Sequence, residues 1–159
     1  MKIQIICVGK LKEKYWTSAC EEYMKRLSRY CDVNITELKE ARLPDSPSAA
    51  QERQVIEEEG NSIIRHIKDG AFVISLEING ESLDSRQLAQ KIENLMVTGK
   101  SHVVFVIGGS LGLSSQVSSR ADMKLSFSKM TFPHQLMRVI LLEQIYRSFK
   151  IINRETYHK

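Results

Sequence analysis

Two segments in the last third of the chain are the candidates for a ligand-binding or catalytic site. Residues 103–112, VVFVIGGSLG, run an apolar stretch into a glycine-rich turn. Residues 125–142, LSFSKMTFPHQLMRVILL, run a second apolar stretch through a polar loop into a long apolar helix. A strand, a loop and a helix in that order build the ligand crevice at the carboxyl ends of an open α/β sheet. Because the two loops follow each other closely, they are predicted to line one pocket.

The glycine loop, Gly108 to Gly112, does not match the common nucleotide fingerprints. GGSLG is neither GxGxxG nor GxxxxGK[ST], and it follows the fourth predicted strand instead of the first. This disfavours a dinucleotide-dependent enzyme. Glycines let the backbone approach a ligand closely, although a tight turn with a purely structural role explains the same residues.

The second loop, FSKMTFP at residues 127–133, is polar in the middle and apolar at both ends. Its main-chain groups could read the edge of a purine while Phe127, Met130 and Phe132 wall the base. The alternative is an ordinary strand-to-helix connection in which Pro133 starts the helix. Leu76, at the end of the third predicted strand, either faces the same crevice or belongs to the core.

A polar stripe of His134, Gln135 and Arg138 begins the last helix. Arg138 follows His134 by four residues, which puts both on one helix face. An arginine on such an apolar helix needs a partner or a pocket. The sequence shows no Ser-His-Asp or Cys-His arrangement and no metal-ligand spacing, so hydrolytic and metal chemistry are poorly supported.

The elements that must position these loops alternate along the whole chain. Their order predicts an α/β fold with a mostly parallel sheet and helices on both faces, in a single domain over residues 1–159. Ser48, Asp84 or Ser85, and Ser114 or Ser115 are the expected helix caps, and Asn79-Gly80 is an expected turn. The predicted strands are 2–8, 32–38, 71–76, 102–107 and 123–127, and the predicted longer helices are 13–30, 49–68, 85–98 and 134–149.

The last helix is apolar nearly all round over its first turns. A helix of that kind must be covered on more than one side. In a domain this small the sheet covers one side, and a second copy of the chain is the natural cover for the other. The sequence therefore predicts a homodimer.

Composition limits the class of protein. The chain is 42% hydrophobic and 26% charged, with no apolar run long enough to span a membrane, and its three cysteines fit reduced thiols in a cytoplasmic protein. The formal net charge is +4, and most of it lies in the tail RSFKIINRETYHK, where four basic residues face one acid. Basic and aromatic neighbours suit RNA phosphates and bases, although a frayed terminus explains the tail as well.

The chain resembles the RlmH family, small SPOUT-superfamily methyltransferases of bacterial ribosomes, over essentially its whole length. The resemblance rests on the start MKIQIICVGK, the strand FVISLEINGE, the loop VFVIGGSLGLS, the segment LSFSKMTFPHQLMRVILLEQIYR and the terminal NRETYHK. Two departures affect the polar segments: Gln135 stands where the family often has proline, and the tail lacks the proline that commonly precedes Tyr-His.

The resemblance implies an α/β fold with a deep C-terminal trefoil knot, a homodimer, and methylation of N3 of a pseudouridine in a hairpin loop of 23S rRNA, with no metal. Ribosomes are the expected substrate because a chain without an added RNA-binding domain must borrow specificity from a large surface. S-adenosylmethionine is the implied methyl donor, bound by Leu76, Gly108, Phe127, Ser128, Lys129, Met130, Thr131 and Phe132.

Methyl transfer to an imide nitrogen needs in-line positioning and loss of a proton. Arg138 or Arg154 is expected to stabilise the resulting anion, and His134 or His158 to accept the proton, with Tyr157 on the substrate side. A non-catalytic ribosome-binding factor is the rival interpretation.

Overall fold

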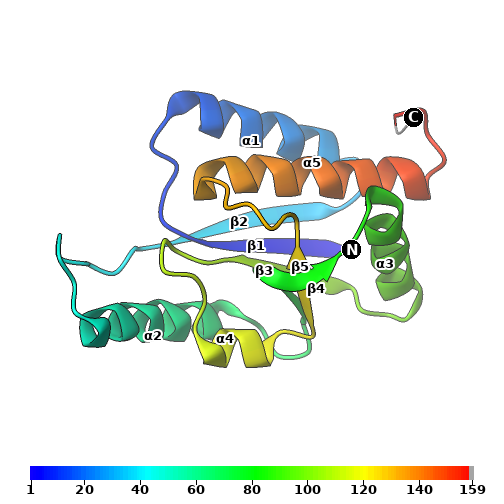
Figure 1. The fold of residues 1–159 in the computed structure, drawn as a ribbon. Coiled ribbons are helices and arrows are strands. Elements are labelled where there is room, and N and C mark those ends of the chain that lie inside the picture. Colours follow the sequence, from blue (N-terminus) through cyan, green and yellow to red (C-terminus); the bar gives the residue numbers. More distant parts are fainter. Residues whose placement is uncertain (158–159) are drawn as a thin grey trace.

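The computed structural model describes residues 1–157, and five strands alternate with five helices along them (Figure 1). The predicted order of elements is confirmed. The elements are β1 (Lys2–Val8), α1 (Lys14–Leu27), β2 (Asp32–Leu38), α2 (Ala49–His66), β3 (Phe72–Ser82), α3 (Ser85–Val97), β4 (His102–Ile107), α4 (Ser115–Arg120), β5 (Met123–Ser126) and α5 (His134–Ile152).

The strands form one sheet in the order β2-β1-β4-β3-β5, and every pairing is parallel. The central strands β1 and β4 are buried on both faces, as parallel strands covered by crossover helices must be. Their side chains alternate between two clusters: Ile5 and Phe105 belong to one, and Ile6 and Val104 to the other.

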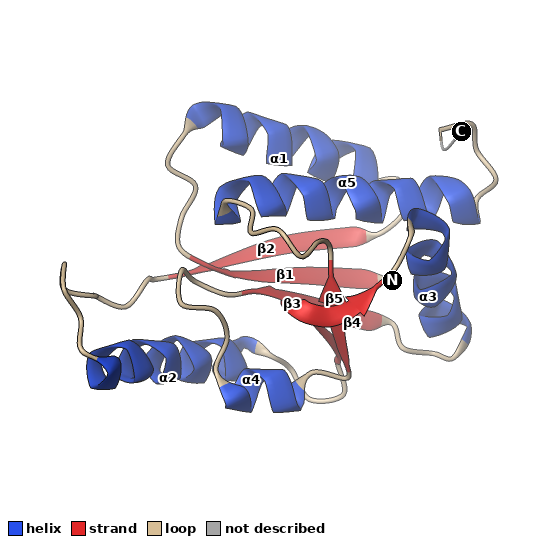
Figure 2. Ribbon diagram, in the orientation of Figure 1, coloured by secondary structure: helices blue, strands red, loops and turns tan. Residues whose placement is uncertain are grey.

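Helices cover both faces of the sheet, as predicted. Figure 2 shows α1 and α5 on one side and α2 and α4 on the other. Leu88 and Ile92 of α3 belong to the same cluster as Leu141 and Leu142 of α5, so α3 packs with the α1–α5 layer. The helices therefore form two layers: α1, α3 and α5 pack on one side of the sheet, and α2 and α4 on the other.

Side-chain caps fix the starts of three helices. Ser48 with Gln51, and Asp84 with Gln87, form complete capping boxes at α2 and α3. Ser114 accepts a hydrogen bond from the backbone N–H of Val117 at α4. The expected caps are confirmed, and the helix bounds differ from the predicted ones by up to three residues.

The expected turn at Asn79-Gly80 is wrong. β3 continues through it to Ser82, with an irregularity between Leu76 and Glu81, and pairs with β5 on both sides of it. A Cβ on Gly80 would lie 2.7 Å from the carbonyl carbon of Lys124 and 2.8 Å from the backbone of Leu125. This glycine lets two backbones approach closely and does not make a turn.

The three cysteines are free and buried, as expected of reduced thiols. Burial raises the pKa of Cys7 and of Cys31 to about 12. No helix within residues 1–157 is long and apolar enough to cross a bilayer.

Candidate active site

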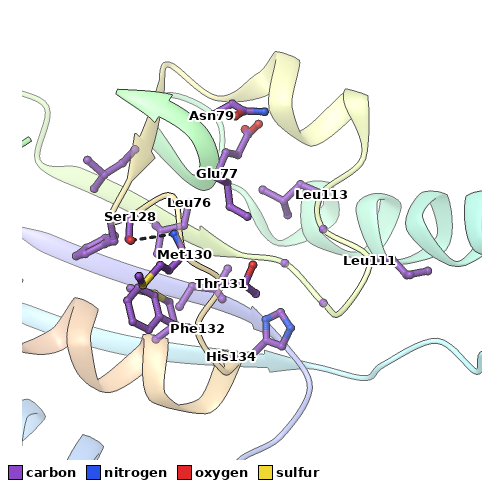
Figure 3. Close-up of a pocket in the computed structure, with 18 residues that line it drawn as sticks. Leu76, Glu77, Asn79, Leu111, Leu113, Ser128, Met130, Thr131, Phe132 and His134 are labelled. Atoms are coloured by element: carbon purple, nitrogen blue, oxygen red, sulfur yellow. Dashed lines mark hydrogen bonds between the residues drawn. The ribbon is translucent and has the colours of Figure 1, made fainter. Parts of the chain in front are cut away.

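A cavity of about 390 Å³ opens at the carboxyl ends of β4 and β5, beside the second half of β3 (Figure 3). The predicted meeting of the two loops at one pocket is thus found in the structure, with the far part of β3 as a third wall. The lining comes from Leu76–Asn79 in β3, Ile107–Gly109 and Leu111–Leu113 after β4, Leu125, Phe127, Ser128 and Met130–Phe132 around the β5–α5 loop, and His134 and Met137 in α5.

The glycine loop is both a tight turn and a cavity wall. The N–H of Gly112 donates to the carbonyl of Gly109 at 3.0 Å, and Gly112 has a φ of 85°, which favours glycine. A Cβ on Gly108 would lie 2.9 Å from Cδ2 of Leu113 and 3.0 Å from the backbone of Gly112. The loop is therefore both a tight turn that requires glycine and part of the cavity wall, so the structural and the ligand-binding interpretations are compatible.

The β5–α5 loop is held from both sides. Ser126 donates its hydroxyl to the carbonyl of Ile78 at 2.9 Å, which ties the end of β5 to β3. The N–H of Met130 donates to Oγ of Ser128 at 2.9 Å. Of the expected cofactor-binding residues, Leu76, Gly108, Phe127, Ser128, Met130, Thr131 and Phe132 line the cavity, whereas Lys129 is exposed and does not.

Glu77 is a lining residue that the sequence analysis missed. Among the described lining residues it supplies the one carboxylate, and each of its oxygens accepts a bond from a serine. The hydroxyl of Ser75 lies 2.6 Å from one oxygen and that of Ser118, on α4, 3.1 Å from the other. The predicted strand ended at Leu76, so the next residue, Glu77, was not expected in the sheet beside the cavity.

A second carboxylate, Glu59 of α2, lies behind the glycine loop. It is 7% exposed, its Oε1 accepts the N–H of Ala41 at 3.1 Å, and its Oε2 has no partner within the described chain. A Cβ on Gly109 would lie 2.6 Å from that Oε2. Burial, and next the nearby Glu40 and Glu58, raise the pKa of Glu59 against the opposing bond from Ala41.

His134 and Arg138, four residues apart on α5, have different surroundings. His134 lines the cavity, whereas Arg138 does not and is 1% exposed. The Arg138 guanidinium lies 2.6 Å from Oε1 of Glu37 and donates to the carbonyl of Gly9 at 2.7 Å. These contacts join α5 to the ends of β1 and β2, and the expected contact of Arg138 with substrate stays a prediction.

The expected RNA-contacting tail folds back on its own helix. Tyr157 donates its hydroxyl to Oε1 of Glu143 at 3.3 Å and lies beneath the guanidinium of Arg147. Arg154 is exposed, with a φ of 55°, and His158 lies outside the described residues. As far as Tyr157 the tail is anchored rather than frayed.

Tail and cavity lie at opposite ends of α5. The helix has 19 residues, which spans about 28 Å at 1.5 Å per residue. Arg154 follows its last turn, whereas His134 of the cavity is its first residue. Arg154 therefore does not reach the cavity of its own chain.

Comparison with known proteins shows the family to which this chain belongs. A family model described as a predicted SPOUT methyltransferase matches residues 1–158, and the chain belongs to the SPOUT methyltransferase family. Proteins named ribosomal RNA large subunit methyltransferase H, from Clostridium botulinum strains Hall and Kyoto, are each 57% identical to it over 159 residues, covering both chains completely. Within the superfamily, the chain is thus a member of the RlmH family.

A distant structure shares the fold. A probable methylase family protein from Haemophilus influenzae matches 99% of this chain and 70% of its own, with a TM-score of 0.54 and 12% identity. Within residues 1–157, no cluster of three or more His, Cys, Asp or Glu side chains could hold a metal ion.

Proposed function

We propose that this chain methylates N3 of a pseudouridine in a hairpin loop of 23S rRNA, on assembled ribosomes, with S-adenosylmethionine as methyl donor. Full-length membership of the RlmH family supports the methyltransferase class and the large-subunit rRNA substrate. The observation that carries the proposal is the convergence of Leu76, Gly108 and the 127–132 loop on one cavity.

The cavity suits an adenosyl group. Its size falls within the usual range of ligand pockets, about 300–1,000 Å³, and its walls combine apolar side chains with main chain of two loops. The hydrogen bond from the N–H of Met130 to Ser128 fixes the conformation of the loop before a ligand binds. Leu76, Gly108 and residues 127–132 would hold the cofactor, with Lys129 contributing its main chain only.

The bound cofactor supplies an electrophilic methyl on a sulfonium. The chain must hold the imide nitrogen in line with that methyl and take up its proton. His134 is the proton acceptor we favour, because it lines the cavity at the start of α5. Arg138 acts as a positioning residue, since its bonds to Glu37 and Gly9 fix α5 against the strand ends beside the cavity.

The anion that forms on the substrate needs a cation, which we assign to Arg154 of a second protomer. The exposed Arg154 is remote from its own cavity. A homodimer packed through α5 with the two helices antiparallel would bring one tail to the other cavity. Tyr157 and His158 of the same tail would then lie on the substrate side.

The outer face of α5 supports such a dimer. Leu136 and Ile140 lie on the side of the helix away from the buried Leu141 and Ile145 and are only half-buried in the single chain. An apolar stripe on an outer helix face is typical of a protein–protein contact.

Three further properties belong to this proposal. The chain acts as a single SPOUT domain over residues 1–159, its C-terminal segment forms the superfamily's trefoil knot, and it works in the cytoplasm, where ribosomes are found.

The test uses purified protein, S-adenosylmethionine and ribosomes from a strain lacking the modification. We expect one methyl per ribosome, identified as N3-methylpseudouridine by mass spectrometry of the digested RNA. Methylation at another base would overturn the site assignment. Ribosome binding without methylation would favour the non-catalytic factor. Calorimetric titration with S-adenosylmethionine, ATP and NAD should show binding of the first alone; preference for NAD would favour the dinucleotide enzyme.

A further inference from the structure

We infer that two lysines of the β1–α1 connection, Lys10 and Lys12, and the first residue of α1, Lys14, form the surface on which the RNA backbone docks beside the cavity. The inference rests on the proposed function and adds to it the location of the RNA contact. It differs from the expectation that the basic tail supplies most of that contact.

The connection emerges next to the glycine loop. β1 pairs with β4 in parallel, with Cys7 opposite Ile107, so both strands end at the same level. Cγ1 of Val8 lies 3.2 Å from where a Cβ on Gly109 would be. The chain that follows Val8 therefore starts at the wall of the cavity.

Two hydrogen bonds hold this connection at the rim. The N–H of Lys12 donates to Oε1 of Gln135 at 2.7 Å, and Gln135 is the neighbour of the lining residue His134. The N–H of Leu11 donates to Oε1 of Glu37 at 3.1 Å, the same oxygen that receives Arg138. Figure 1 shows the β1–α1 connection and the start of α5 at the same end of the sheet.

The charge of this rim is not neutralised within the chain. Lys10, Lys12 and Lys14 are exposed, and the ion pairs among residues 1–157 include none of them. In the tail, by contrast, Arg147 pairs with Glu143 and Lys150 with Glu155. The nearest acid in sequence is Glu13. Lys129, on the β5–α5 loop, is a further exposed cation at this edge of the sheet. Lys39 and Arg42 are also exposed, but three acids line the same hollow as they do: Glu40, Glu58 and Glu59.

Local helix stability does not explain a lysine at the start of α1. Lys14 is the first residue of the helix, Glu13 makes no side-chain cap, and the first turn holds no acid. A cation at a helix N-terminus opposes the macrodipole, whereas an anion there is stabilised. An RNA phosphate in front of α1 would satisfy both the lysines and the helix.

The test compares two triple variants with equal change in charge. One is Lys10→Gln, Lys12→Gln, Lys14→Gln. The control is Lys2→Gln, Lys68→Gln, Lys100→Gln, three exposed lysines at the amino-terminal edge of the sheet. Methylation of ribosomes is measured over a salt series, with S-adenosylmethionine affinity and thermal midpoint as checks on the fold.

We expect the rim variant to raise the KM for ribosomes at least about tenfold and to lower the slope of log affinity against log salt by about 2, since each phosphate contact contributes about 0.7 in single strands. The kcat and the cofactor affinity should stay unchanged, and the control should differ little from wild type. Equal effects of the two triples, or an unchanged slope in the rim variant, would overturn the inference.

A photo-crosslinking residue in place of Lys12 identifies the partner. Crosslinks to 23S rRNA are expected, and crosslinks to ribosomal protein alone would overturn the RNA assignment. Wild-type protein that fails to methylate ribosomes contradicts the proposed function instead, so the two failures are distinguishable.

Discussion

Two carboxylates, one lining the cavity and one behind the glycine loop, have different surroundings. Glu77 lines the cavity, and two serine hydroxyls hold its oxygens while leaving lone pairs for further donors. Glu59 is buried behind Gly109 with one oxygen unpartnered. The first is prepared to bind a ligand, and the second carries a charge that burial makes costly.

Glu77→Gln should weaken S-adenosylmethionine binding by about tenfold to a hundredfold, because a hydrogen bond to a charged group contributes about 1.5–3 kcal/mol. Isothermal titration measures the loss. Glu81→Gln is the matched control, since Glu81 lies on the same strand, is exposed and does not line the cavity. Equal affinities for wild type and Glu77→Gln would remove Glu77 from the cofactor site.

Glu59→Gln should change how stability depends on pH. The pKa of Glu59 is raised in the folded chain, so its contribution is complete below the unfolded pKa and is lost as pH rises through the folded pKa. Between those two pKa values, the unfolding free energy of wild type relative to Glu59→Gln should fall by about 1.4 kcal/mol per pH unit. Urea unfolding from pH 4 upward checks this; a difference independent of pH would contradict it.

At the scale of elements, the crossing of β3 and β5 shapes the site. β3 pairs with β5 before and after its irregularity, and the stretch between, Glu77 to Asn79, lines the cavity. Gly80 permits the crossing because the β5 backbone occupies the space of its missing side chain. The cavity wall therefore depends on a contact between two backbones.

Gly80→Ala should destabilise the fold by about 1–3 kcal/mol, the usual cost of overpacking, because the obstructing atoms are backbone and cannot rotate away. Chemical denaturation measures the change, and the exposed Glu81→Ala serves as the control. A Gly80→Ala protein as stable as wild type would show that the strands can separate without loss.

At the scale of the whole molecule, α5 joins the cavity to the tail and offers one face to the core and another outward. Leu141 and Ile145 are fully buried in the single chain, so they report on folding. Leu136 and Ile140 lie on the opposite face and report on association. Substitutions on the two faces therefore test folding and dimer formation separately.

Ile140→Glu should yield a folded monomer, because it places a charge at the proposed dimer contact without entering the core. Leu141→Glu should unfold the chain, since a fully buried, unpaired charge is costly. Sedimentation velocity and circular dichroism distinguish the outcomes. A wild-type protein that sediments as a monomer at micromolar concentration would refute the dimer.

Mixing two defective chains tests whether cavity and tail come from different protomers. One lacks residues 154–159, and the other carries Gly108→Val, whose side chain would displace the loop at Leu113 and Gly112. Each homodimer should be inactive on ribosomes. Mixed dimers should recover activity, because the intact cavity of one chain meets the intact tail of the other. No recovery, with mixed dimers verified, would place both parts in one chain.

The order of elements, the helix caps and the two loops of the site were predictable from the sequence, because these depend on local periodicity and on capping and turn residues. Residues such as Ser48, Asp84 and Ser114 bond within a few positions of themselves. The resemblance to a known family supplied the chemistry, which no local pattern in this chain encodes.

Contacts between residues distant in the sequence became visible only in the folded structure. It turned Asn79-Gly80 from a turn into a strand crossing, placed Glu77 in the cavity, and paired Arg138 with Glu37, 101 residues away. It also placed Tyr157 away from the cavity, which lies at the start of α5, whereas Tyr157 follows the end of that helix. Such contacts depend on strand order and helix packing, and a single sequence read along its length carries no measure of those distances.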